Sequence, residues 1–357
     1  MKKNIVVTVP KLTAPGGVSA FWNALLPEFS AIKEVELKPL EIGGYGKNIL
    51  GPLIDQWRFR KKVDSSVDLV VLNPSLGFRS FFRDGLFAKQ LASKKVTFVV
   101  FFHGWDPAFE KKVDKKHLNF FRTSFGKASK IFVLSNAFKI KLIEWGFKGD
   151  VIVETTNVDI NLLVDFSIHQ KFEHQRSTDS IKLLFLSRLL KDKGIFETID
   201  AFVKLKEEHL NLELIIAGDG MNYEEVIEYA EHIEGVVITG HVDGQEKIEL
   251  LKQSHLYCLP SYSEGLPTSV LEAMAFGMPV ITTPVGGLID FFQDEIMGYF
   301  VQPKNVQQTV EKLDLLLSNR ETIAKMGMSN HNYAIEHLTS TKMSNRLYEH
   351  FTNAIIE

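Results

Sequence analysis

The sequence of 357 residues contains a single cysteine, Cys258, which lies inside an apolar run. One cysteine cannot form a disulfide within the chain, so the sequence indicates a protein of a reducing compartment. Since the neighbours of Cys258 are apolar, we interpret its thiol as a small buried core group rather than a reactive one.

Long apolar runs are also absent. No run approaches the roughly 18 residues that a membrane-spanning helix needs. The apolar part of the first segment, MKKNIVVTVP, is only about five residues long, which is too short for a signal peptide and suits a first β-strand. We therefore expect a cytoplasmic protein without a membrane span.

Motifs of several other protein classes are missing. No two aspartates stand two positions apart, so the sequence lacks an Asp-x-Asp clamp for a metal-bound diphosphate, and no His/Cys cluster has zinc-ligand spacing. The pattern Gly-x-Gly-x-x-Gly does not follow the first predicted strand, which disfavours a dinucleotide-dependent dehydrogenase. The sequence predicts no metal ion and no cofactor.

The net charge is only −3, but it is unevenly spread. The first 165 residues hold 25 Lys+Arg and 16 Asp+Glu, a balance of +9, whereas the remainder hold 16 and 28, a balance of −12. Basic residues alternate with aromatic ones, including Phe81, Phe82, Phe120 and Phe121, in segments 58–62, 78–95 and 111–127. This composition suits an anionic membrane surface or, alternatively, a solvated face over core phenylalanines. Nucleic-acid binding is disfavoured, because no recognised motif accompanies the basic clusters.

Short apolar runs recur along the chain with helical segments between them. The runs are rich in β-branched residues and do not alternate with polar ones, which is typical of strands buried on both faces of a parallel sheet. They cover residues 4–9, 67–73, 95–102, 130–135 and 150–155 in the first half, and 181–187, 212–218, 235–240, 255–260 and 279–283 in the second.

These runs predict an α/β protein with two doubly wound, Rossmann-like domains of about five or six strands each. The polar stretch 161–180 has no strand pattern and is the predicted linker. We place the first domain at 1–165 and the second at 166–338, and we expect the helical segment 339–357 to pack back on the first. Ligands of open parallel sheets bind at the carboxyl ends of the strands, so two domains facing each other would hold a ligand in the cleft between them.

The segment EGLPTSVLE (264–272) has features of an anion-binding site and follows the predicted strand 255–260. Pro267 suits the first position of a helix. The N–H groups of such a helix start lack intrahelical partners and, together with the helix dipole, favour an anion. Glu264 and Glu272 would flank a bound diphosphate and accept hydrogen bonds from hydroxyl groups at its two ends. The alternative is a helix whose early glutamate only complements the dipole.

Two carboxylates repel a diphosphate, so such a site needs cations. Arg188 follows the predicted strand 181–187, and Lys193 lies in the loop after it. Arginine can grip phosphate oxygens bidentately, whereas lysine acts as a point charge. Parallel strands end at one edge of a sheet, so both cations are predicted to lie near the helix start; the alternative is that they are ordinary surface residues.

These motifs, in this order over residues 181–300, resemble the retaining glycosyltransferases of family four, which have the two-domain GT-B fold. The resemblance rests on the pair Glu264 and Glu272, on SRLLKDKG with Arg188 and Lys193, and on LIIAGDG (214–220) and VITGHV (237–242). The first half matches more loosely, through TAPGGVSAFW (13–22), FFHGWD (101–106) and TNVD (156–159), which lacks the family's glycine.

The resemblance implies transfer of a sugar from a nucleotide-diphosphate sugar to an acceptor hydroxyl, with retention and without a metal. The acceptor would be a glycan or lipid-linked molecule of bacterial-type polysaccharide, lipopolysaccharide or glycolipid synthesis. The implied catalytic residues are His103, Arg188, Lys193 and Glu264. The implied donor-binding residues are Gly16, Gly17, Gly240, His241, Val242, Gly265, Leu266, Pro267, Thr268, Ser269 and Glu272, the last towards the ribose.

Several alternatives stay open at this point. Asp106 could orient His103 or meet the acceptor, or it could cap a helix that begins at Pro107. The glycine-rich stretch 43–46 could be a loop on the acceptor side or a plain turn. A GT-B nucleotide-sugar epimerase and a non-catalytic nucleotide-sugar-binding subunit are the alternative functions. The basic first half adds the hypothesis that the protein is peripheral on the inner face of a membrane.

Overall fold

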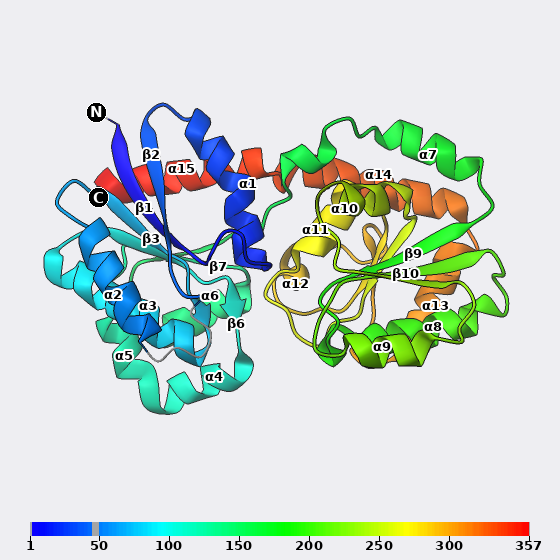
Figure 1. Cartoon of the computed structure of the whole chain (residues 1–357), viewed down its shortest axis with the longest axis horizontal. Coiled ribbons are helices and arrows are strands. Elements are labelled where there is room, and N and C mark those ends of the chain that lie inside the picture. Colours follow the sequence, from blue (N-terminus) through cyan, green and yellow to red (C-terminus); the bar gives the residue numbers. More distant parts are fainter. Residues whose placement is uncertain (1, 45–49, 357) are drawn as a thin grey trace. The chain divides into compact units, whose positions relative to one another are not determined.

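The computed structural model describes residues 2–44 and 50–356, and the chain divides into two compact units. The first unit comprises Met1–Asp159 and Ser340–Glu357, and the second comprises Ile160–Thr339. Each unit is a parallel sheet with helices on both faces (Figure 1). The division falls after Asp159, a few residues before the boundary that the sequence suggests.

The described part of the first unit contains a six-stranded parallel sheet in the order β2-β1-β3-β5-β7-β8. Its strands are β1 (Lys3–Val9), β2 (Val35–Glu41), β3 (Leu69–Leu72), β5 (Phe98–Phe101), β7 (Lys130–Val133) and β8 (Asp150–Val153). The short pair β4 (Ser75–Leu76) and β6 (Gly104–Trp105) follows β3 and β5 along the chain. Strands β3, β5 and β7 are buried at every position, as the apolar runs predict.

Strand β2 is missing from the set that the apolar runs predict. It lies at the edge of the sheet, and its sequence VELKPLE is mostly polar and partly exposed. An edge strand tolerates Pro39, because only one of its sides carries ladder hydrogen bonds. A search for buried runs therefore detects central strands and overlooks this one.

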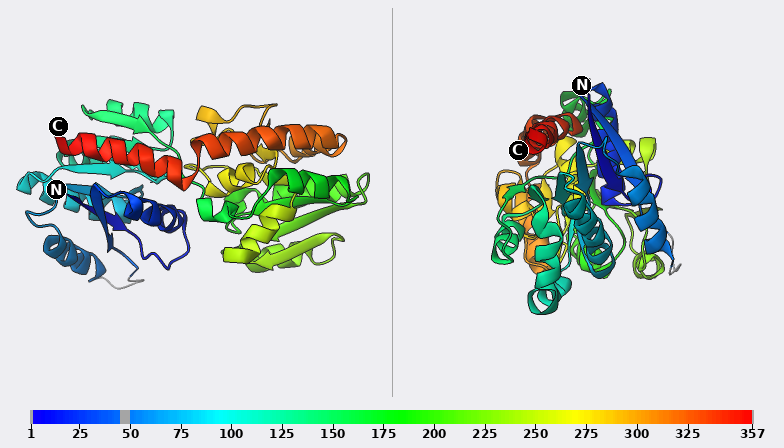
Figure 2. Two further views of the ribbon diagram at one scale, coloured as in Figure 1. Left: turned by 90° about the horizontal axis from the view of Figure 1, so that it is seen from above. Right: turned by 90° about the vertical axis from the view of Figure 1, so that its left-hand side faces the viewer.

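The helices of the first unit include one from the end of the chain. They are α1 (Gly17–Ala31), α2 (Gly51–Lys62), α3 (Phe78–Lys94), α4 (Pro107–Lys112), α5 (Leu118–Thr123), α6 (Asn136–Glu144) and α15 (Ser340–Ile356). In α15, the ring of Phe351 stacks 6.0 Å from that of Phe29, and Arg346 donates to the buried carboxylate of Glu154 at 3.0 Å. Helix α15 is thus an integral part of the first unit (Figure 2).

The phenylalanines of the basic segments belong to the core of the first unit. Phe81 and Phe121 are fully buried, and Phe82 and Phe120 are partly buried against the same core. The expectation that these four rings provide an aromatic surface is therefore wrong. In α3 the rings of Phe81 and Phe87 are buried, whereas Phe78 of the same helix is 63% exposed.

The described part of the second unit contains a six-stranded parallel sheet in the order β11-β10-β9-β12-β13-β14. The strands are β9 (Ile181–Leu186), β10 (Leu212–Ala217), β11 (Val236–Gly240), β12 (Leu256–Leu259), β13 (Val280–Thr282) and β14 (Gly298–Phe300). From β9 the chain adds strands β10 and β11 on one side, and from β12 it adds β13 and β14 on the other. The boundary between β9 and β12 is therefore the switch point, where ligands of doubly wound sheets bind.

The helices of the second unit include one inside the predicted linker. They are α7 (Ile168–Arg176), α8 (Ile195–Lys206), α9 (Tyr223–Ala230), α10 (Gly244–Gln253), α11 (Thr268–Ala275), α12 (Leu288–Phe291), α13 (Val306–Leu317) and α14 (Arg320–His337). The linker prediction at 161–180 is wrong over α7, where Phe172 is buried. Buried Lys171 donates to the carbonyls of Leu251 and Phe276 at 2.9 and 2.7 Å. At least one polar residue of this segment is therefore hydrogen-bonded in the interior.

Candidate active site

Two loops leave the sheet of the second unit at its switch point. Strand β9 ends at Leu186 and leads to Arg188, while β12 ends at Leu259 and leads to Ser261 and Glu264. The two strands are direct neighbours in the sheet. The sequence prediction that Arg188, Lys193 and the segment 264–272 share one edge of one sheet agrees with this topology.

Lys193 and Glu264 form a nearly buried ion pair. The Nζ atom of Lys193 lies 2.6 Å from Oε1 of Glu264, and the two side chains are 10% and 12% exposed. Ser261 also donates to Oε1, at 2.8 Å, so one carboxylate oxygen accepts from both side chains. Lys193 is therefore paired with Glu264 in this structure.

The start of α8 holds Lys193 close to β12. Gly194 has a positive φ of 74°, and a Cβ atom there would lie 2.5 Å from the carbonyl oxygen of Pro260. The N–H of Tyr262 donates to the carbonyl of Asp192 at 2.8 Å, which joins the two loops directly. Only glycine allows this approach, so the loop sequence fixes the distance of the ion pair.

Arg188 is exposed and, among the described residues, its guanidinium has no hydrogen-bond or ion-pair partner. Its backbone is nevertheless fixed, because the N–H of Leu189 donates to the carbonyl of Asp219 at 3.0 Å. Gly218 packs so closely that a Cβ atom there would lie 1.8 Å from the carbonyl oxygen of Ser187. The site thus presents one cation on a rigid loop that remains available for an anion.

Helix α11 begins at Thr268, one residue later than the sequence predicts. Pro267 is therefore the N-cap and not the first helical residue. No side chain of the described residues caps this helix start. The hydroxyl of Tyr257 lies 2.7 Å from Oγ of Ser269 and 2.8 Å from the carbonyl of Leu186, so it ties the helix to β9. Burial raises the pKa of Tyr257 well above 10, which keeps this hydroxyl neutral.

Glu272 forms a second ion pair, which the sequence does not reveal. Its Oε1 atom lies 2.8 Å from Nζ of Lys247 in α10, and Glu272 is 7% exposed. Lys247 stands 25 positions away in the sequence without any motif of its own, so only the tertiary structure brings the pair together. The three cations Arg188, Lys193 and Lys247 exceed the two carboxylates by one positive charge.

The loop after β13 packs against the backbone of Glu264 and Gly265. Gly286 has a φ of 56°, and a Cβ atom there would lie 2.1 Å from the carbonyl oxygen of Gly265. The N–H of Gly287 donates to the same carbonyl at 2.6 Å. This contact orders the chain just before Leu266 and Pro267, and no pattern in the sequence indicates it.

The segment Gly240–Val242 comprises the last residue of β11 and the two residues after it. The carbonyl of Gly240 accepts from the N–H of Gly218 at 2.7 Å, so this loop joins the loop that supports Arg188. Val242 is buried, whereas the side chain of His241 is 58% exposed and lies 3.9 Å from Asp243. Backbone and exposed imidazole are the groups that this loop offers to a ligand.

His103 lies in the first unit, two residues after the end of β5. Its Nε2 lies 2.9 Å from Oδ1 of Asn73, and its ring stacks on Phe101 at 4.1 Å between centroids. Burial lowers the pKa of His103 from 6.5 to about 3, so the imidazole is neutral at physiological pH. A neutral imidazole can exchange hydrogen bonds with a sugar or phosphate but adds no positive charge.

The other candidates of the first unit have simpler surroundings. Gly16 is the N-cap of α1 and Gly17 its first residue, and a Cβ atom at Gly17 would meet no atom within 4 Å. Asp106 accepts from the N–H of Ala108 at 2.8 Å, which confirms the capping interpretation. The stretch 43–46 lies partly outside the described residues.

Cys258 is a core residue, as its neighbours predict. The thiol is fully buried, and its Sγ lies 3.7 Å from the hydroxyl of Thr198. Burial raises the pKa of Cys258 from 9 to about 12, so no thiolate forms at physiological pH.

Comparison with known proteins finds a family model that matches part of the chain. Residues 167–332, nearly the whole second unit, match the family model of glycosyl transferases group 1. Arg188, Lys193, Glu264 and Glu272 all lie within the matched residues.

Relatives of known sequence include several glycosyltransferases. An uncharacterized glycosyltransferase of Methanocaldococcus jannaschii is 36% identical over 45% of this chain and 42% of its own length. The putative teichuronic acid biosynthesis glycosyltransferase TuaC of Bacillus subtilis is 26% identical over 62% and 55%. The capsular polysaccharide biosynthesis glycosyltransferase CapM of Staphylococcus aureus is 27% identical over 53% and 50%. The chain spans about half the length of these relatives.

Solved structures share the fold over nearly the whole chain. Sucrose-phosphate synthase from Thermosynechococcus elongatus superposes with a TM-score of 0.78 at 16% identity, over 99% of this chain and 100% of that one. HepE of Anabaena, in complex with UDP and glucose, gives 0.75 at 15% identity, over 98% and 100%. The prediction of a GT-B fold with two Rossmann-like units is confirmed.

Proposed function

We propose that the chain is a metal-independent, retaining glycosyltransferase that uses a nucleotide-diphosphate sugar. The observation that carries the proposal is the grouping of unpartnered Arg188 and the Lys193–Glu264 pair on neighbouring strand ends next to the uncapped α11. Cations and unpaired N–H groups at a helix start stabilise a diphosphate. The match to the group 1 module supports the same chemistry.

In this proposal the bond between the sugar and the diphosphate breaks first. Negative charge develops on the leaving diphosphate, and Arg188, Lys193 and the N–H groups of α11 stabilise it. Glu264 accepts hydrogen bonds from the sugar hydroxyls, and Glu272 accepts from the ribose. The acceptor hydroxyl then attacks from the face that the diphosphate leaves, and a phosphate oxygen of the leaving group takes its proton. On the first unit, neutral His103 offers hydrogen bonds to the substrates.

The acceptor is proposed to be a glycan or a lipid-linked sugar of a cell-surface polymer, and the transferred sugar a hexose or pentose. Two relatives, TuaC and CapM, are named for teichuronic acid and capsular polysaccharide biosynthesis, which supports this class of acceptor. The similar structure WaaG is a glycosyltransferase involved in lipopolysaccharide biosynthesis, and it shares the fold with a TM-score of 0.70 over 98% of this chain and 99% of its own.

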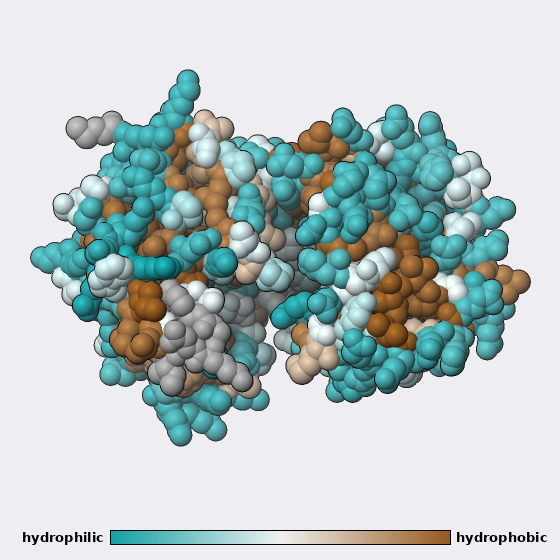
Figure 3. Space-filling model, viewed as in Figure 1, coloured by the Kyte–Doolittle hydropathy of each residue, from teal (hydrophilic) through white to brown (hydrophobic). Residues whose placement is uncertain are grey.

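The first unit also has a surface that suits an anionic bilayer. A groove of about 460 Å³ between α2 and α3 is lined by Leu53, Trp57 and Leu86, which are 65%, 57% and 46% exposed, together with Arg60 and Lys89. In Figure 3, brown residues lie among teal ones in the region where Figure 1 labels α2 and α3.

Exposed apolar side chains beside cations favour binding at a lipid interface. We therefore propose that the protein is cytoplasmic and attaches peripherally to the membrane that holds its acceptor. In the described part of the chain, no helix combines the length and apolar character needed to cross a bilayer.

The test of this function is a panel of nucleotide-diphosphate sugars, first for binding by thermal shift and then for transfer in excess EDTA. We expect one donor to raise the melting temperature and to be consumed in EDTA, with the anomeric configuration of the product unchanged by NMR. Activity that EDTA abolishes and Mg²⁺ or Mn²⁺ restores would contradict the metal-independent step. Binding without turnover would favour a non-catalytic subunit, and the absence of any binding would refute the donor site.

A further inference from the structure

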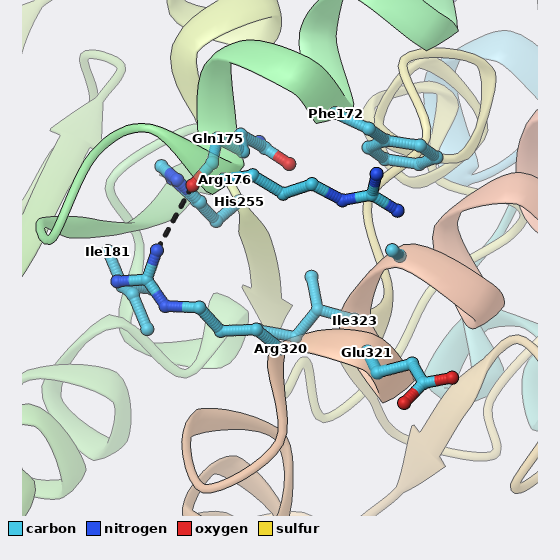
Figure 4. A pocket seen from close by; sticks show the side chains of 9 residues that line it. Phe172, Gln175, Arg176, Ile181, His255, Arg320, Glu321 and Ile323 are labelled. Atoms are coloured by element: carbon cyan, nitrogen blue, oxygen red, sulfur yellow. Dashed lines mark hydrogen bonds between the residues drawn. The ribbon is translucent and has the colours of Figure 1, made fainter.

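A pocket of about 330 Å³ lies at the amino ends of β9 and β12, at the edge of the sheet opposite to Arg188 and Glu264. Its lining comes from α7, from the residues that begin β9 and precede β12, and from the first turn of α14 (Figure 4). The residues of the lining are Phe172, Gln175, Arg176, Ile181, His255, Arg320, Glu321, Ile323 and Ala324.

The floor of this pocket contains a buried donor without an acceptor. The N–H of Lys182 donates to Nδ1 of His255 at 3.1 Å, so the neutral imidazole must carry its proton on Nε2. His255 is 7% exposed, and among the described residues its Nε2 has no hydrogen-bond partner. A buried N–H without an acceptor is unfavourable, so this group is primed to donate to an incoming ligand.

The two arginines that line the pocket differ in whether their guanidinium groups already have hydrogen-bond partners. Arg320 is engaged, since its guanidinium donates to the carbonyls of Gln175 at 3.0 Å and Thr178 at 2.5 Å, and also to that of Asp179. Arg176 is exposed and has no hydrogen-bond or ion-pair partner in the part of the chain that the structure describes. Figure 4 shows its guanidinium extending towards the ring of Phe172.

The electrostatic environment of His255 is positive. Burial, together with repulsion from Lys171, Arg320, Lys182 and His174, lowers its pKa from 6.5 to about 3. The same surroundings attract an anion. The rest of the floor is apolar, because it consists of Phe172, Ile181 and Ile323. These side chains are 8%, 8% and 4% exposed.

We propose that this pocket binds a small organic anion, a carboxylate or phosphate monoester carried on a flat apolar body. The apolar body lies against Phe172, Ile181 and Ile323, the anionic group pairs with Arg176, and an oxygen atom accepts from Nε2–H of His255. The site is separate from the proposed donor site. Since β9 and β12 run from this pocket to Arg188 and Glu264, an occupant contacts the starts of the two strands whose ends form the donor site.

The test is calorimetric titration of the full-length protein with benzoate and phenyl phosphate, and with benzamide as the neutral isostere of benzoate. We expect both anions to bind at least about tenfold more tightly than benzamide. Arg176→Gln should weaken both anions about tenfold, whereas Lys325→Gln should leave their affinities unchanged. Lys325 is the matched control, because it is an exposed cation of α14 that does not line the pocket.

A second readout locates the bound probe. In protein labelled with ¹⁵N-histidine, benzoate should shift the Nε2 signal that disappears in His255→Phe, because a new hydrogen bond forms there. Arg176→Gln keeps the test decisive if His255→Phe does not fold. Equal affinity for benzoate and benzamide, unchanged affinity in Arg176→Gln, or an unmoved His255 signal at saturation would each overturn the proposal.

Discussion

His103 is a histidine whose surroundings keep it neutral. Its pKa is about 3 in the folded chain, against 6.5 for an exposed histidine. Between these values the unfolded chain binds a proton that the folded chain does not, so stability is full above pH 6.5 and falls as the pH drops towards 3. The expected loss is about 1.4 kcal/mol per pH unit below 6.5, and therefore up to about 2 kcal/mol between pH 7 and pH 5.

Urea unfolding of wild type and His103→Gln at both pH values checks this expectation. The four tryptophans, Trp22, Trp57, Trp105 and Trp145, all lie in the first unit, so their fluorescence reports the unfolding of the unit that contains His103. The decrease in stability from pH 7 to pH 5 should be smaller in His103→Gln by up to about 2 kcal/mol, and unchanged in the exposed control His241→Gln. An identical decrease in stability in all three proteins would show that the fold does not keep His103 neutral.

At the residue scale, the sequence predicts the groups that end strands. Arg188 and Glu264 follow strongly apolar runs, so their place at one sheet edge can be inferred before the structure is known. Lys247 and Gly286 are different, because no local pattern marks them and only packing brings them to Glu272 and Gly265. The ion pair between Lys193 and Glu264 also depends on the close approach of Gly194 to Pro260. The positions of these residues in the sequence do not reveal this contact.

At the scale of elements, the loop after β13 determines the position of the segment before α11. Gly286→Ala adds a Cβ atom in the left-handed region, which costs about 1–2 kcal/mol, and also forces it against the carbonyl of Gly265. Gly244 is the matched control, because it has a similar φ of 50° and a Cβ atom added there would meet no atom within 4 Å.

We expect Gly286→Ala to lower the unfolding free energy of the second unit by at least about 1 kcal/mol more than Gly244→Ala, since overpacking adds its own cost. It should also weaken nucleotide diphosphate binding, whereas Gly244→Ala should not. Urea unfolding followed by circular dichroism, with titration of the nucleotide, measures both effects. Equal losses in the two variants would mean that the loop does not support the site.

Among the elements, apolar runs mark most strands, including the half-exposed edge strand β11. The central strands of both sheets are buried on each face, and their apolar runs mark them to within a few residues. The three-residue edge strand β14 has no predicted run. Strand β2 and helix α7 escape prediction for physical reasons. The first is half-exposed at a sheet edge, and the second buries Lys171, whose amine is satisfied by carbonyls of distant segments.

At the scale of the whole molecule, the basic first half and the acidic second half have different partners in our account. Lys111 and Lys115 are exposed on the first unit. Each lysine near an anionic bilayer contributes about 1 kcal/mol, so the pair Lys111→Glu and Lys115→Glu should reduce binding to anionic vesicles by about tenfold or more. The control pair Lys204→Glu and Lys325→Glu changes the same charge on the second unit and should have little effect.

Co-sedimentation with vesicles of neutral lipid, and with vesicles that contain phosphatidylserine, measures this binding at low and moderate salt. Wild type should prefer the anionic vesicles, and the preference should weaken as salt screens the charges. Equal binding to both kinds of vesicle, or binding to neither, would make the charge asymmetry a solvated face and favour an acceptor in solution.

The central claim is that the switch point of the second unit binds the diphosphate of a nucleotide sugar. Its most direct test is calorimetric titration of wild type, Arg188→Ala and Lys204→Ala with the nucleoside diphosphate that stabilises the wild type most. Arg188 is exposed and Lys204 is an exposed cation on α8, so neither change should unfold the chain. We predict that Arg188→Ala weakens the affinity more than tenfold, or by more than about 1.4 kcal/mol, and that Lys204→Ala binds like wild type. If Arg188→Ala binds the nucleotide as tightly as wild type, the diphosphate site lies elsewhere and the account is contradicted.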